Sequence, residues 1–159
     1  VSFVGALDLQ QSRDPNPSHW MTENHDEILF LLSYSHEKLD SLVQKLIYIW
    51  ITAIDQEALK VTPLLAQAFI NHPHSCLKNF HKGDDMIYEG YLDNLQDLLF
   101  TDYASNGTAA HKKMEATRKN MIRSLKIVQK HTTQQYEKEM AQKALAALQK
   151  VRVKPARGE

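Results

Sequence analysis

Apolar residues recur at alternating intervals of three and four along most of this 159-residue chain. Such spacing places them on one face of a helix, and no stretch shows the sustained alternation that a half-buried strand needs. The chain has only five glycines and five prolines, and 43% of it is hydrophobic, so it can fill one core and is not expected to be loop-rich. We therefore expect an all-α fold: an antiparallel helical bundle of three to four main helices with short connecting helices and a long C-terminal helix.

Interruptions of this pattern predict the domain organisation. Two prolines within residues 14–17 exclude a continuous helix there, so residues 1–17 are expected to form an arm or a short helix. A helical bundle domain is expected over residues 18–150. Its first long helix is expected to run from residue 18 or 22 to about residue 59 and to be the central, most buried helix.

Capping residues mark the helices that follow. Thr62 before Pro63 predicts an N-cap and the first position of a short helix over residues 63–70. A short helical turn is expected over residues 74–81. Asp84 is then expected to cap a medium helix of about 19 residues.

The last helix is expected to be the longest. A turn at Asn106-Gly107 predicts its start, and it extends over residues 109–150, which is about 60 Å at 1.5 Å per residue. Beyond Thr132 it still carries apolar residues, and an uncovered apolar stripe normally marks an interface. We therefore expect an intermolecular contact there, unless the first long helix covers the stripe within the monomer. Residues 151–159 are expected to form a frayed basic tail. The expected interface residues are Tyr136, Met140, Leu145, Leu148 and Val151.

Charge is divided unevenly between the two parts of the chain. Residues 1–110 hold 6 Lys and Arg against 15 Asp and Glu, whereas residues 111–159 hold 13 against 4. The favoured interpretation is a basic helix lying on an acidic body; the other is a basic helix that meets an external anion. Nucleic acid is the less favoured anion, because stacking aromatics are scarce in this helix. The expected basic face consists of Lys112, Lys119, Arg123, Lys126 and Lys130.

Eight histidines raise the question of a metal site. Di-iron bundles of the ferritin type need Glu-x-x-His on two helices, and this pattern does not occur in the chain. His36, between Leu32 and Leu39 on the helical seam, is expected to point inward and to be satisfied by a side-chain or backbone partner. No metal and no cofactor is therefore expected. The alternative is a hemerythrin-like site that uses His36, His81, His111 and Glu115.

Nucleophilic catalysis has little support in the sequence. Cys76 lies near His72 and His74 in the chain, but no third orienting group or Gly-rich phosphate loop accompanies them. A single cysteine excludes an internal disulfide, so we expect a reducing, cytoplasmic compartment. The longest lightly charged run, residues 46–54, is about half of a bilayer span, so no membrane span is expected.

These features favour a non-enzymatic helical-bundle module for protein–protein association, with a regulatory or assembly role. Its expected partner is another protein or a second copy of the chain. One alternative is a bundle that binds a ligand or a metal through core-facing histidines. The other is a module that binds an anion or nucleic acid through its basic C-terminal helix.

Overall fold

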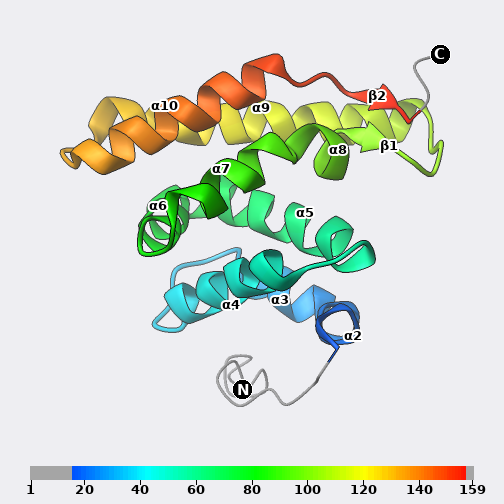
Figure 1. Ribbon diagram of the computed structural model, residues 1–159, viewed down its shortest axis with the longest axis horizontal. Coiled ribbons are helices and arrows are strands. Elements are labelled where there is room, and N and C mark those ends of the chain that lie inside the picture. Colours follow the sequence, from blue (N-terminus) through cyan, green and yellow to red (C-terminus); the bar gives the residue numbers. More distant parts are fainter. Residues whose placement is uncertain (1–15, 157–159) are drawn as a thin grey trace.

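Nine helices account for most of the described chain, residues 16–156, in the computed structural model (Figure 1). The all-α fold expected from the sequence is confirmed. Residues 1–15 of the expected arm and residues 157–159 of the expected tail lie outside the described part. In chain order, the elements are α2 (Pro17–Glu23), α3 (His25–Leu31), α4 (Leu39–Thr52), α5 (Gln56–Asn71), α6 (Pro73–His81), α7 (Asp85–Asp93), α8 (Leu95–Leu99), β1 (Thr101–Asp102), α9 (Thr108–His131), α10 (Gln135–Lys150) and β2 (Lys154–Pro155).

The helices are arranged around α5 (Figure 1). α9 and α10 lie on one side of it and α2, α3 and α4 on the other, and α5 packs against helices of both groups. Phe69 of α5 is buried and stacks against Phe80 of α6 and Tyr91 of α7, with ring centroids 5.8 and 5.7 Å apart. The prediction that the first long helix is the central one is therefore wrong, because α5 holds that position.

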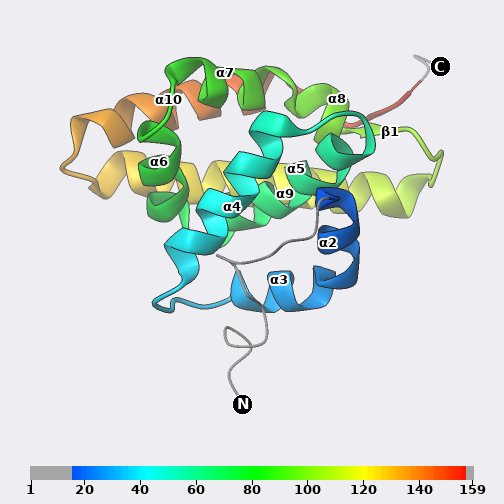
Figure 2. The same ribbon diagram turned by 60° about the horizontal axis from the view of Figure 1, so that its bottom comes forward.

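The first long helix, expected to end near residue 59, is divided into α2, α3, α4 and the start of α5. Figure 2 shows α2 and α3 meeting at a sharp angle. At the C-terminal end of α3, backbone carbonyl groups accept hydrogen bonds from side chains. His36 donates to the Leu31 oxygen and His72 donates to the Leu32 oxygen, each over 2.9 Å. Because such partners satisfy the free carbonyls of a helix end, the helix stops here without a Gly or Pro.

Pro63 does not begin a helix, contrary to the prediction for residues 63–70. It lies inside α5, and the Thr62 hydroxyl donates to the Ala58 carbonyl oxygen over 2.6 Å instead of capping. The helix starts after Asp55, whose φ of 45° turns the chain out of α4. A proline inside a helix costs about 3 kcal/mol relative to alanine, and buried side chains on both sides of Pro63 offset this cost.

The single helix expected over residues 109–150 is broken at residues 132–134 into α9 and α10. The Thr132 hydroxyl accepts a hydrogen bond from the Gln134 N–H over 3.1 Å and donates to Glu137 over 2.6 Å. The chain reverses there, and α10 runs back along α9 (Figure 1). α9 remains the longest helix of the described part with 24 residues, but the prediction of a single helix of about 60 Å is wrong.

Side chains from other helices hold α10 in place. The Tyr88 hydroxyl of α7 donates to the Met140 carbonyl oxygen over 2.6 Å, and burial raises the pKa of this hydroxyl, which keeps it protonated as a donor. Nε of Arg118 in α9 donates over 2.8 Å to the Leu148 carbonyl oxygen, near the C-terminal end of α10. α10 is thus attached to α7 in its first half and to α9 near its C-terminal end.

Residues 151–155 also belong to this body and are not the frayed tail expected from the sequence. Val151 is buried. The Gln96 amide of α8 makes two hydrogen bonds with the backbone of Arg152, accepting from its N–H and donating to its oxygen, each over 2.8 Å. β2 then pairs with β1 in parallel. Within residues 16–156, no helix is both long and apolar enough to cross a bilayer.

Candidate interaction surface on α9

Five basic side chains share one exposed face of α9, and together we call them the basic stripe. At 100° and 1.5 Å per residue, they fall within an arc of about 60° and extend over about 27 Å. The buried residues Met121, Leu125 and Val128 lie on the opposite face of the helix. The stripe consists of Lys112, Lys119, Arg123, Lys126 and Lys130, all of them exposed.

None of the five cations of the basic stripe forms an ion pair with another described residue. In α10, Lys143 pairs with an acidic residue of another helix: its ammonium lies 3.0 Å from the carboxylate of Glu89 in α7. Arg118 pairs with Glu115 of its own helix. The basic helix α9 does lie against the body of the fold, where it packs on α5 and α6, but the five cations of the basic stripe face outward.

Two isoleucines lie among the cations of the basic stripe. Ile127 is 55% exposed and Ile122 is half-buried. They line a shallow depression of about 340 Å³ together with four stripe residues. Sequence reasoning missed this apolar component, although the helical position of Ile127 next to Lys126 and Lys130 could have revealed it. The surface thus combines positive charge with exposed aliphatic area.

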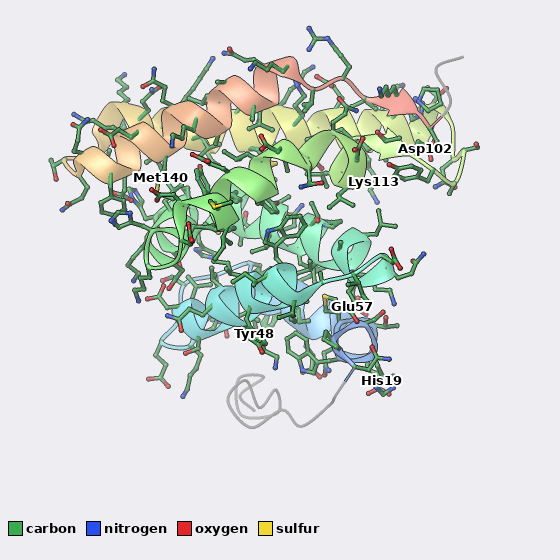
Figure 3. All side chains as sticks on the ribbon, in the orientation of Figure 1. His19, Tyr48, Glu57, Asp102, Lys113 and Met140 are labelled. Atoms are coloured by element: carbon green, nitrogen blue, oxygen red, sulfur yellow. The ribbon has the colours of Figure 1, made fainter. Side chains whose placement is uncertain are left out.

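The start of α9 is fixed by a buried carboxylate, Asp102, at one end of the molecule (Figure 3). Asp102 accepts hydrogen bonds from the Gly107 N–H over 3.1 Å and from His111 over 3.0 Å. Hydrogen bonds from the backbone of Asn106 and Gly107, together with His111, hold the pKa of Asp102 below its usual value. The ionised carboxylate therefore positions the first turn of α9.

The expected interface residues of α10 are covered within the chain. Leu145, Leu148 and Val151 are buried, and Met140 and Tyr136 are half-buried. The Tyr136 ring stacks on His81 of α6 with centroids 4.0 Å apart. The uncovered stripe that motivated an intermolecular contact is thus absent, because α10 folds back onto α9 and contacts α6 and α7.

The histidines proposed for the metal alternative are not brought together. His36 lies in the loop before α4, where it donates to Leu31 and accepts from the Lys38 N–H, so it is satisfied by backbone groups. His81 stacks on an aromatic ring and His111 bonds Asp102, while Glu115, the fourth proposed ligand, pairs with an arginine. Among residues 16–156, no group of three or more His, Cys, Asp or Glu side chains is arranged to hold a metal ion.

Cys76 lies in the core, out of contact with solvent. It is fully buried, and burial raises the pKa of its thiol, which is the opposite of the shift that activates a nucleophile. His72 and His74, its neighbours in sequence, are engaged elsewhere: His72 bonds the end of α3, and His74 lies 2.6 Å from Glu137 of α10.

Comparison of the chain with protein-family models, with curated proteins and with solved structures finds no match.

Proposed function

We propose that this protein is a non-enzymatic helical module for protein–protein association, and that the basic stripe of α9 is a docking surface for an acidic protein. The observation that carries the proposal is the row of five exposed cations on one face of a single helix, none of which forms an ion pair with a residue of the described range 16–156. A surface of this kind steers the approach of a partner with the opposite charge.

The aliphatic residues of the stripe favour a protein partner over nucleic acid. Exposed Ile127 and half-buried Ile122 offer contacts to apolar side chains. Proteins that bind single-stranded nucleic acid stack bases on aromatic rings, and α9 has no Phe, Tyr or Trp. An acidic helix with apolar residues at intervals of three and four matches the stripe in both charge and hydrophobicity.

The magnitude of the electrostatic contribution limits what the basic stripe does alone. Exposed ion pairs contribute about 0.2–1 kcal/mol each, so five of them provide at most a few kcal/mol, whereas micromolar affinity requires about 8 kcal/mol. Contacts with Ile127 and further partner surface must supply the rest. We therefore expect binding that is strongly weakened by salt.

A test uses the full chain and a synthetic amphipathic Leu–Glu helix of about 18 residues, which matches the length of the stripe. Binding is measured by fluorescence anisotropy at low and high salt, with a DNA duplex and phosphatidylserine vesicles as competing probes. The Leu–Glu peptide is expected to bind more tightly than either competitor at equal salt.

Two double variants with the same change in net charge locate the surface. Lys119→Glu with Lys126→Glu reverses the middle of the stripe, and is expected to weaken peptide binding roughly tenfold or more, since each attraction becomes a repulsion. Lys138→Glu with Lys150→Glu, on exposed positions of α10, is the matched control. Equal losses in both variants, or a clear preference for DNA or vesicles, would refute the proposal.

A further inference from the structure

A second candidate surface is a groove between α4, α5 and α7, which we call the α4–α7 groove. It has a volume of about 470 Å³. Most of the residues that line it are of apolar types, and they come from the C-terminal end of α4, the loop after it, the first turn of α5, and α7 and α8. The lining residues are Trp50, Ile51, Ala53, Asp55, Ala58, Met86, Ile87, Gly90, Asn94 and Leu98.

Large apolar side chains are exposed at this groove. Ile51 of α4 is 50% exposed and Met86 of α7 is 76% exposed, and both line it. Ile54, next to the lining residues Ala53 and Asp55, is 69% exposed. Scattered exposed apolar residues are normal on protein surfaces, but residues from different elements that gather at one hollow mark an interaction site.

Gly90 keeps one wall of the groove open. It lies inside α7, and a Cβ atom added at this position would meet no atom within 4 Å. Glycine within a helix is less favourable than alanine by roughly 0.5–1 kcal/mol, and packing inside the chain does not require it here. The absent side chain leaves room for another helix to approach α7 closely.

The charges around the groove specify the kind of occupant. Asp55 is the charged lining residue, and none of the described lining residues is basic. Asp97, next to the lining residue Leu98, is exposed. An occupant that fits this surface has apolar residues for the floor and basic residues for the rim.

We infer that the α4–α7 groove binds a basic amphipathic helix of a partner protein. The walls of the groove are helices that present side chains, so recognition follows the helix-in-groove mode, with apolar residues of the partner at intervals of three and four. This inference is independent of the basic stripe, since it rests on different residues and on the opposite charge. The chain then has two docking surfaces, one for an acidic segment and one for a basic segment.

The test uses the full chain and a synthetic amphipathic Leu–Lys helix of about 18 residues, with a scrambled Leu–Lys peptide and the Leu–Glu helix as controls. Trp50 lines the groove, so its fluorescence is expected to shift to shorter wavelength when the Leu–Lys helix covers it. Anisotropy of a labelled peptide gives the affinity. The scrambled peptide and the Leu–Glu helix are expected to leave the emission of Trp50 unchanged.

Substitutions at Gly90 provide a matched pair. Gly90→Leu fills the groove and is expected to weaken Leu–Lys binding at least about tenfold, as loss of a central pocket does in other interfaces, whereas Gly90→Ala leaves most of the space open and retains binding. Helix content and thermal stability are measured for both. If Gly90→Leu does not fold, the double variant Asp55→Asn with Asp97→Lys decides, with Glu23→Gln and Asp26→Lys, at exposed positions of α2 and α3, as its control with the same change in net charge.

Three results would overturn the inference. One is unchanged Leu–Lys affinity in a folded Gly90→Leu variant and in the double variant of Asp55 and Asp97. Another is equal binding of the scrambled peptide. The third is self-association of the wild-type chain that Gly90→Leu abolishes, because the occupant would then be a second copy. Failure of the basic stripe is distinguishable, because Lys119→Glu with Lys126→Glu is expected to retain Leu–Lys binding.

Discussion

The burial of α10 predicts that Leu148→Ala destabilises the isolated chain. Leu148 is fully buried, and the side chain lies on the part of α10 that packs against α9. Removing a buried leucine side chain costs about 2–5 kcal/mol, through lost burial and the cavity that remains. For a domain of this size, 1 kcal/mol corresponds to about 2–4 °C in Tm. We therefore expect a fall in Tm of roughly 5–15 °C.

The assay is thermal and urea unfolding, followed by circular dichroism, over a wide range of protein concentration. Because the apolar face of α10 is covered within the chain, Tm of the wild type should not depend on concentration, whereas an interface between copies would make it rise with concentration. Gln142→Ala, at an exposed position of the same helix, is the control and should change stability by less than about 0.5 kcal/mol. A neutral Leu148→Ala, or a Tm that depends on concentration, would refute the fold-back of α10.

Three further predictions concern other parts of the chain. Leu46→Ala, at a fully buried position of α4, should cost about 2–5 kcal/mol in urea unfolding, and less than about 0.5 kcal/mol would mean that this face is solvated. Gly107→Ala should destabilise the fold by about 1–3 kcal/mol, because φ of 81° and ψ of −158° are accessible almost only to glycine. Gly90→Ala, inside a helix, should instead stabilise it by about 0.5–1 kcal/mol. Equal changes in the free energy of unfolding for the two variants would contradict this reasoning. Hydrogen bonds from Lys78 and Ser75 lower the pKa of Asp40 from its ordinary value of 3.8. The contribution of these hydrogen bonds to folding stability is therefore complete above pH 3.8 and is lost as the pH falls through the lower pKa of the folded state. Asp40→Asn should therefore reduce the fall of Tm with decreasing pH on the acid side. An unchanged slope of Tm against pH would contradict this role of Asp40.

Much of the helical content could be predicted from local sequence. The spacing of apolar residues identifies helices, because one buried face is a local property. Asp84 is the N-cap of α7, as predicted, and its carboxylate accepts from the Met86 N–H over 2.9 Å. The turn at Asn106-Gly107 also precedes α9 as expected. In these cases, the residues that fix the structure are close together in the chain.

The helix ends that could not be predicted depend on residues far away. His72 lies 40 residues from the Leu32 carbonyl that it bonds, and Glu137 at the start of α10 pairs with His74, 63 residues away. The apolar positions of the sequence change their helical phase near Thr132, and this is a local signal of the break between α9 and α10. Its meaning as a chain reversal depended on packing against other helices.

The two candidate surfaces differ in how far the sequence reveals them. The positions of Lys119 and Lys126 on one helix face follow from helical geometry alone. Their lack of ion partners among the described residues does not follow from helical geometry, because it depends on where the acidic helices lie in the fold. The α4–α7 groove was not predictable, since Ile51 and Met86 come from separate helices and meet only after α4 and α7 have packed.

The two hydrogen bonds between Gln96 and Arg152, with the pairing of β1 and β2, have a mechanical consequence. A tensile force applied to the chain beyond Pro155 reaches α8 through these bonds before it can reach α10. The α9–α10 hairpin lies between the two clamped segments and carries no load until the clamp ruptures. Under force, the protein should therefore first lengthen by a step that corresponds to the release of residues 151–155, and α10 should peel away from α9 only afterwards.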